Sequence, residues 1–180
     1  MEWSAEERQY LRSKIRDVEG FKPGIVFYDI TTLLKDAKAF GMLLNGLAKR
    51  YAGYNLDYIV GIESRGFIFG APLAMSLGVG FVPVRKKGKL PAATLSERYA
   101  LEYGFDEVEI HRDAFAEKPK ARVLLVDDLI ATGGTAEASL RLVSAAGAEC
   151  VESCFLLHLV ACDGKKRIES LAPVFSVLDI

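Results

Sequence analysis

The feature that most constrains the fold is an alternation of short apolar segments with helical patterns. Residues 66–77 and 134–146 have apolar, alanine-containing patterns that are typical of helices packed in a core. Strands that are apolar on both faces and separated by helices indicate a mostly parallel, twisted sheet with helices on both faces. In such α/β sheets, ligands bind beyond the carboxyl ends of the strands. The five predicted strands are residues 58–62, 81–84, 122–127, 151–160 and 174–178.

The N-terminal part follows a different pattern. Ser4 and Glu7 are spaced as a capping box, and the apolar face that follows predicts a helix over residues 4–18. Residues 21–34 contain a Pro-Gly pair and mixed apolar residues, which indicates a loop. Asp36 is placed to cap a second helix. The buried stripe predicted for this second helix is Phe40, Leu43, Leu44 and Leu47.

Residues 94–113 interrupt the alternation. Val108 and Ile110 alternate with charged residues, and the stretch contains six acidic and two basic side chains. This charge density argues against a central strand. We expect a solvent-facing antiparallel hairpin around residues 104–106 that projects from the core as a flexible lid.

The amino-acid composition restricts the functional classes to which the chain can belong. Lys and Arg number 23 against 24 Asp and Glu, so the formal net charge is −1, whereas nucleic-acid-binding domains usually have a basic excess. Three cysteines without a Cys-x-x-Cys pair favour a reducing compartment. No apolar run approaches the ~20 residues of a membrane span, and the first residues lack a secretory signal pattern. We therefore expect one cytoplasmic domain over residues 1–180, with no nucleic acid and no membrane as partner.

The most informative stretch, residues 123–135, reads Val-Leu-Leu-Val-Asp-Asp-Leu-Ile-Ala-Thr-Gly-Gly-Thr. It predicts a buried strand, two adjacent acids, a loop of small residues and the start of a helix. Gly133 and Gly134 allow a ligand to approach the backbone, and the N-terminus of the helix attracts an anion. Thr132 and Thr135 add hydroxyl donors. The lysine of a Walker loop is absent, so the site suits one phosphate rather than a triphosphate.

Asp127 and Asp128 follow the predicted strand. Adjacent carboxylates at this position can accept hydrogen bonds from a vicinal diol, as on ribose, and can help to hold Mg²⁺ through water. The alternative is that an Asp merely caps the helix. The order of the elements in the whole run favours a site for a ribose 5-phosphate.

Two further strand ends carry basic residues. Ser64 and Arg65 follow the first predicted strand, and residues 85–89 (Arg-Lys-Lys-Gly-Lys) follow the second. Four positive charges in five residues can clamp a pyrophosphate leaving group, because fixed donors stabilise the charge that develops in the transition state. The alternative is a solvated basic loop or a nucleic-acid patch. A place at the strand ends, beside a phosphate loop, favours the clamp.

These segments resemble the type I phosphoribosyltransferases, and among them the adenine phosphoribosyltransferases. Residues 123–135 are similar to the family's signature for phosphoribosyl pyrophosphate (PRPP). Further matching segments are residues 23–27 (PGIVF), 61–67 (GIESRGF), 84–91 (VRKKGKLP) and 100–104 (ALEYG). The resemblance implies a purine salvage enzyme that transfers the 5-phosphoribosyl group from PRPP to adenine, giving AMP and pyrophosphate. It also implies Mg²⁺ as cofactor, a homodimer, and an N-terminal hood formed by residues 1–34.

The resemblance assigns roles to the residues around PRPP. Asp127 and Asp128 would bind the ribose hydroxyls. The 5-phosphate would be cradled by Ala131, Thr132, Gly133, Gly134 and Thr135. The pyrophosphate would be bound by Ser64, Arg65, Arg85, Lys86 and Lys89.

At position 6 adenine carries an amine, whereas guanine and hypoxanthine carry an oxygen there. Backbone carbonyls can therefore select adenine, because they accept a hydrogen bond from the amine. The resemblance implies that backbone groups of Val26 and Tyr28 read the adenine edge, while Phe27 and Leu129 enclose the ring. The family often has arginine at the position of Tyr28, and a backbone contact tolerates that change. Without the resemblance, residues 21–31 would be interpreted as a hydrophobic loop that caps the core.

Glu102 lies in the predicted lid. The resemblance implies that this carboxylate handles the proton at N7 or N9 of the purine, as a general acid does, which typically raises a rate about 10²–10⁴-fold. It also implies that closure of the lid excludes water from the reacting ribose. The alternative is an ordinary surface glutamate. At the level of the whole protein, the rival hypotheses are transfer to another base and a regulator that senses PRPP without catalysis.

Overall fold

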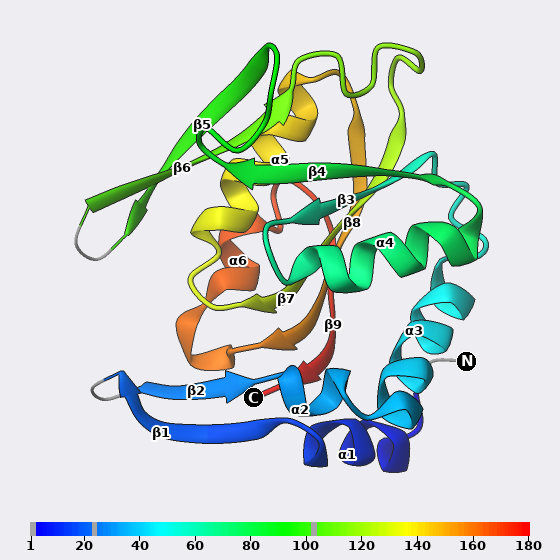
Figure 1. Ribbon diagram of the computed structural model, residues 1–180, viewed down its shortest axis with the longest axis vertical. Coiled ribbons are helices and arrows are strands. Elements are labelled where there is room, and N and C mark those ends of the chain that lie inside the picture. Colours follow the sequence, from blue (N-terminus) through cyan, green and yellow to red (C-terminus); the bar gives the residue numbers. More distant parts are fainter. Residues whose placement is uncertain (1–2, 23–24, 102–103) are drawn as a thin grey trace. The chain divides into compact units, whose positions relative to one another are not determined.

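The computed structural model of the chain describes residues 3–22, 25–101 and 104–180 (Figure 1). Its contacts group the chain into two compact units, Met1–Gly53 and Tyr54–Ile180. The assignment of all 180 residues to one domain, with residues 1–34 as a hood, stays a prediction.

In the N-terminal unit the predicted capping box is confirmed, because Ser4 Oγ accepts from the Glu7 N–H at 3.1 Å and Glu7 Oε2 from the Ser4 N–H at 2.8 Å. The predicted helix length is wrong, and so is the loop predicted over residues 21–34. Val18 pairs with Phe27 in an antiparallel ladder, which draws both segments into strands. The elements are α1 (Ala5–Ser13), β1 (Arg16–Lys22), β2 (Ile25–Asp29), α2 (Thr31–Leu34) and α3 (Ala37–Tyr51).

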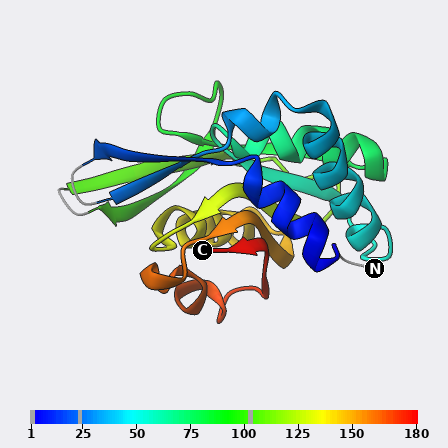
Figure 2. The same ribbon diagram turned by 90° about the horizontal axis from the view of Figure 1, so that it is seen from below.

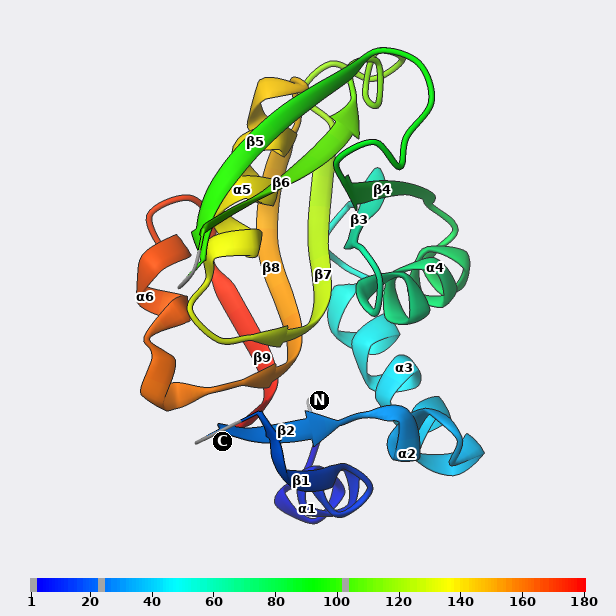
Figure 3. The same cartoon turned by 60° about the vertical axis from the view of Figure 1, so that its left-hand side comes forward.

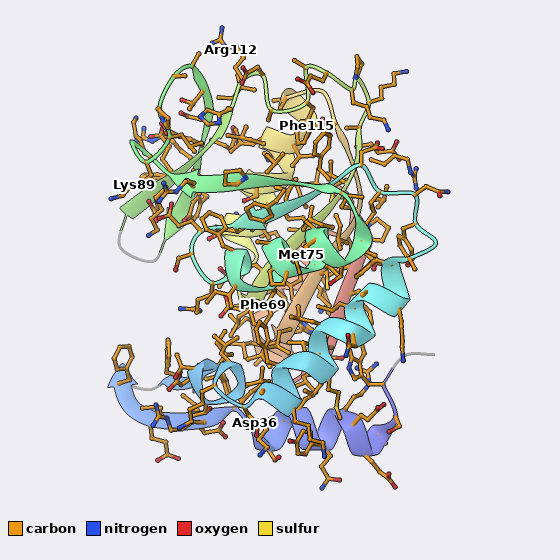
Figure 4. All side chains as sticks on the ribbon, turned by 45° about the vertical axis from the view of Figure 1, so that its right-hand side comes forward. Asp36, Phe69, Met75, Lys89, Arg112 and Phe115 are labelled. Carbon is orange, nitrogen blue, oxygen red and sulfur yellow. The ribbon has the colours of Figure 1, made fainter. Side chains whose placement is uncertain are left out.

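Asp36 caps α3 as predicted, and Figure 4 labels it at the start of this helix. Its Oδ1 accepts from the N–H groups of Lys38 at 3.1 Å and Ala39 at 3.0 Å. Phe40 and Leu44, expected in the buried stripe, are only partly buried. The stripe that the fold buries follows a spacing of four residues and consists of Ala39, Leu43, Leu47 and Tyr51.

Replacing Asp36 with alanine is expected to lower the Tm by a few degrees, because two N–H groups of α3 lose their acceptor. Lys14 also loses its ion pair with Asp36, which spans 2.7 Å. Asp36→Asn retains a capping oxygen and serves as the matched control. Thermal unfolding followed by circular dichroism measures both variants, and equal losses in the two would contradict the capping role.

The C-terminal unit contains a seven-stranded sheet of order β5-β6-β4-β3-β7-β8-β9. Five neighbouring strands of this sheet are parallel: β4, β3, β7, β8 and β9. This confirms the predicted α/β fold with a mostly parallel sheet. Its elements are β3 (Tyr58–Ile62), α4 (Gly66–Leu77), β4 (Gly80–Lys86), β5 (Thr94–Leu101), β6 (Gly104–His111), β7 (Arg122–Ile130), α5 (Gly134–Ala145), β8 (Glu149–His158), the 3₁₀ turn η1 (Val160–Cys162), α6 (Gly164–Ile168) and β9 (Val174–Asp179).

Helices cover both faces of this sheet, as predicted. Figures 2 and 3 show α4 on one face and α5 with α6 on the other. The central strands are therefore buried on both sides: Ile59 and Val60 of β3 are completely inaccessible to solvent. On α4, Phe69 is buried, whereas Met75 is 80% exposed (Figure 4). No helix in the described part of the chain is both long and apolar enough to span a membrane.

The antiparallel hairpin predicted over residues 94–113 is confirmed, with β5 and β6 paired along their whole length. The predicted turn is wrong: Phe105 and Asp106 lie inside β6, and the connecting residues 102–103 are outside the described residues. The solvent-facing interpretation is wrong for the base of the hairpin. Val108 and Ile110 belong to the core, and β6 pairs with β4, so β6 is an internal strand.

Candidate functional site

The segment after β7 forms a cradle for an anion. Residues Leu129 to Ala136, together with Asp127, line a cavity of about 150 Å³. Helix α5 begins there, and its N-cap is Gly133, which has a φ of +78° and no side chain that could bond to the first turn. The N–H groups of that turn therefore remain available to a phosphate. The structure brings together residues 131–135, as the sequence predicted.

The cradle is supported from behind by α6, which the sequence analysis did not single out. A Cβ on Gly133 would lie 2.7 Å from the carbonyl oxygen of Gly164, and a Cβ on Gly164 would lie 2.1 Å from the carbonyl oxygen of Ala131. Glycine is required at both positions because the two backbones touch. No local pattern around Gly164 could have revealed this contact.

Asp127 and Asp128 lie within β7, which continues to Ile130 instead of ending at residue 127 as predicted. Pairing with β3 stops at Val126, whereas pairing with β8 continues to Ile130. The two acids therefore begin the part of β7 that no longer pairs with β3. Neither acid caps α5, since its N-cap is Gly133, so the alternative interpretation of the acids is wrong.

The two carboxylates differ in their surroundings. Asp128 is 4% exposed, and its Oδ2 accepts from Arg65 Nε at 2.5 Å. Asp127 Oδ1 accepts from the N–H of Asp128 at 2.8 Å. Burial, and then the charge of Asp128, raise the pKa of Asp127 well above its ordinary value. The fold therefore disfavours ionisation of Asp127, which lies beside the ion pair of Asp128 and Arg65.

Arg65 links two predicted regions. Together with Ser64 it lies between β3 and α4, where Arg65 is the N-cap residue and the Glu63–Ser64 peptide bond is cis. Its ion pair with Asp128 joins the predicted pyrophosphate loop to the predicted ribose-binding acids. This contact shows that the segments at the carboxyl ends of β3 and β7 lie next to each other.

The basic cluster after β4 is arranged around Glu63. Arg85 and Lys86 are the last residues of β4, which extends two residues beyond its predicted end. The Arg85 guanidinium donates to both Glu63 oxygens at 3.0 and 3.1 Å, and the Lys86 N–H donates to Glu63 at 3.1 Å. The Arg85 guanidinium lowers the pKa of Glu63, which therefore stays ionised at neutral pH.

Acids of β6 contact the rest of this cluster. Lys86 pairs with Asp106 at 3.0 Å, Lys87 pairs with Glu107 at 2.9 Å, and Glu109 accepts from the backbone N–H of residue 88 at 3.0 Å. The cluster is therefore not a bare solvated loop, because most of its charge is balanced locally. Lys89, labelled in Figure 4, forms no ion pair among the residues that the structure describes.

The half of the hairpin nearer its turn contacts the phosphate cradle through Tyr99. This side chain is 8% exposed, and its hydroxyl donates to Asp106 at 3.0 Å. Its ring lies 3.3 Å from the position of a Cβ on Gly134. Burial raises the pKa of Tyr99, so the hydroxyl stays protonated and acts as a donor. Neither Tyr99 nor Asp106 carried a signal in the sequence.

The residues predicted to read adenine fall in both units. Val26, Phe27 and Tyr28 lie in β2 of the N-terminal unit, in a strand rather than a loop, and Leu129 lies in β7 of the C-terminal unit. The Phe27 ring is 4.9 Å from that of Phe21.

Glu102 lies outside the described residues, and its predicted role stays a prediction. No group of three or more His, Cys, Asp or Glu side chains in the described part of the chain could hold a metal ion by itself.

Comparisons with known proteins agree on one family. The sequence profile of the phosphoribosyl transferase domain matches residues 31–180. The chain is 62% identical over 181 residues to the adenine phosphoribosyltransferase of Sulfurimonas denitrificans, covering 100% of both chains. The adenine phosphoribosyltransferase structure from Rhodothermus marinus superimposes with a TM-score of 0.91 at 48% identity, covering 98% of this chain and 100% of that one. The Saccharomyces cerevisiae enzyme, complexed with an imino-altritol bisphosphate and adenine, gives a TM-score of 0.90 at 39% identity over 97% and 100% of the chains.

Proposed function

The chain belongs to the adenine phosphoribosyltransferase family, and we propose that it transfers the 5-phosphoribosyl group from PRPP to adenine in purine salvage. The products are AMP and pyrophosphate. The observation that carries this proposal is the uncapped anion cradle of α5 beside the Asp128–Arg65 pair, on a sheet with the type I phosphoribosyltransferase fold.

The reaction is a substitution at C1 of the ribosyl group with inversion. The bond from C1 to the pyrophosphate oxygen breaks, a bond from purine N9 to C1 forms, and the N9 proton leaves the base. The cradle holds the 5-phosphate, while Asp127 and Asp128 accept hydrogen bonds from the ribose hydroxyls. Ser64, Arg65, Arg85, Lys86 and Lys89 stabilise the departing pyrophosphate, whose charge increases as the bond breaks.

Mg²⁺ fits this chemistry. Mg²⁺ usually takes one or two carboxylates and completes its coordination with substrate phosphates and water. Asp127 and Asp128 supply such carboxylates. When bound, Mg²⁺ neutralises part of the pyrophosphate charge.

For the base, we propose that backbone groups of Val26 and Tyr28 read the adenine edge and that Phe27 and Leu129 enclose the ring. Glu102 handles the proton at N7 or N9 of the purine, and the hairpin of β5 and β6 acts as the lid.

We also propose a cytoplasmic homodimer. The three cysteines are free thiols, which suits a reducing compartment. Light scattering of the purified protein tests whether it is a dimer.

The experiment compares a panel of nucleobases as substrates. Purified protein, PRPP and Mg²⁺ are mixed in turn with adenine, guanine, hypoxanthine, xanthine and orotate, and the nucleotide formed is measured by chromatography. AMP should form from adenine at a rate well above any other product. A folded protein that forms no AMP would refute the proposal, and faster product from another base would reassign the substrate. Binding of PRPP without turnover of any base would favour a sensor.

A further inference from the structure

The first turn of α5 contains a carboxylate that opposes the proposed phosphate site. Glu137 is the acidic residue of that turn, and its side chain is 18% exposed. A negative charge there stabilises an isolated helix but repels an anion bound at the same N-terminus. Arg141 and Arg167 lower the pKa of Glu137, so the carboxylate is ionised at neutral pH.

Two arginines balance this charge from different places. Arg141, one turn along α5, donates from Nη2 to Glu137 at 2.8 Å. Arg167 comes from α6 and donates from Nε to Glu137 at 2.5 Å. Figure 3 shows α6 and α5 on the same side of the sheet.

Arg167 differs from Arg141 because it also touches the cradle. Its Nη1 donates to the carbonyl oxygen of Thr132 at 3.4 Å, a long contact, and lies 3.5 Å from the position of a Cβ on Gly134. A carbonyl held from outside the loop cannot turn its oxygen toward a bound anion. The adjacent N–H groups then face the phosphate.

We infer that Arg167 is a positioning residue for the 5-phosphate of the substrate. It neutralises Glu137 and fixes the Thr132 carbonyl, and so keeps the cradle attractive to an anion. Together with the contact of Gly164 on Ala131, this makes α6 the rear support of the phosphate loop. The inference rests on the proposed function, because it takes the ligand to be a ribose 5-phosphate group.

The test measures binding by calorimetry with two probes, ribose 5-phosphate for the cradle and pyrophosphate for the basic cluster. Arg167→Met should weaken ribose 5-phosphate about tenfold, whereas the affinity for pyrophosphate should stay within about twofold. Arg167→Lys should recover part of the loss. The matched control is Arg141→Met, which removes a partner of Glu137 without touching the cradle, and it should change ribose 5-phosphate binding by less than about threefold.

A double variant separates the two parts of the inference. Adding Glu137→Gln to Arg167→Met removes the carboxylate that Arg167 no longer helps to balance and should restore part of the affinity for ribose 5-phosphate. In steady-state kinetics Arg167→Met should raise the KM for PRPP and leave the KM for adenine unchanged. Unchanged ribose 5-phosphate binding in Arg167→Met, or equal weakening of both probes, would overturn the inference. If Arg167→Met does not fold, the same comparison is made with Arg167→Lys.

The binding assay also keeps the inference separate from the proposed function. Binding of ribose 5-phosphate that depends on Arg167, in a protein that forms no AMP, would refute the function and support the inference. Formation of AMP with no dependence on Arg167 in either assay would refute the inference alone.

Discussion

A variant carrying Asp127→Asn and Asp128→Asn is expected to form AMP at least about 10²–10³ times more slowly than the wild type. Both substitutions preserve shape but remove the carboxylates that, under the proposed function, accept hydrogen bonds from the ribose hydroxyls and attract Mg²⁺. Initial rates at saturating adenine and PRPP measure the loss. Retention of more than a tenth of the wild-type rate would contradict the assigned role of these acids.

The two single variants should differ in stability. Because the fold raises the pKa of Asp127, ionising this carboxyl costs folding free energy that is absent when it is protonated. The cost appears as pH rises from the ordinary carboxyl pKa through the folded pKa. Asp127→Asn should therefore raise the Tm, and by more at pH 8 than at pH 4. An equal change of Tm at the two pH values would contradict this.

Asp128→Asn should instead destabilise the protein. It removes the charge that pairs with Arg65 at 2.5 Å, at a cost of about 1–2 kcal/mol. The cost stays modest because the Arg65 side chain is 46% exposed and can be solvated. Chemical denaturation measures the free energy of unfolding of each variant. A loss in Asp128→Asn with a gain in Asp127→Asn would show that the charge of Asp128 stabilises the fold, whereas that of Asp127 does not.

The second large effect is expected from Gly66→Ala. A Cβ at this position would lie 2.6 Å from the carbonyl oxygen of Val126 and 3.1 Å from Asp127 Oδ1, so α4 must move away from β7. The expected cost is about 1–3 kcal/mol in stability. Displacement of Arg65 from its partner Asp128 should reduce the rate about 10²-fold.

Gly41→Ala is the matched control for this substitution. Gly41 also lies in a helix, but a Cβ there would meet no atom within 4 Å. Its activity should equal that of the wild type, and its stability should rise by up to about 0.5–1 kcal/mol. Rates and Tm values for the two variants are compared directly. If Gly66→Ala behaves like Gly41→Ala, the close packing of α4 on β7 does not limit the site.

The parallel part of the sheet could be predicted from the sequence because its strands are short apolar segments separated by helical patterns, and the central strand β3 is buried on both faces. The N-terminal strands could not. Val18 fits a helical face as well as a strand, and only its pairing with Phe27 decides between them. The ends of β4 and β7 were underestimated for a similar reason. Charged residues such as Lys86 and Asp128 remain in a strand when a neighbouring strand continues to pair with the backbone of their segment, β6 with β4 and β8 with β7.

The candidate site was predictable where its chemistry is contiguous. The 13 residues from 123 to 135 contain a strand, two acids and a loop of small residues, and in the fold residues 129–135 and Asp127 line one cavity. The supporting residues were not predictable, because they come from distant elements. Asp106 and Arg167 have ordinary local sequences and acquire their roles only through the partners that the tertiary structure brings to them.

The carboxylates around the basic cluster have a consequence for ionic strength. Lys86 and Lys87 already have counterions in Asp106 and Glu107, so an arriving pyrophosphate replaces existing ion pairs instead of meeting bare charges. Exchange of one carboxylate for one phosphate oxygen leaves the number of paired charges nearly constant. The affinity of this cluster for pyrophosphate should therefore vary less with salt concentration than four uncompensated cations would require. The same exchange lowers the free energy needed to release pyrophosphate as a product.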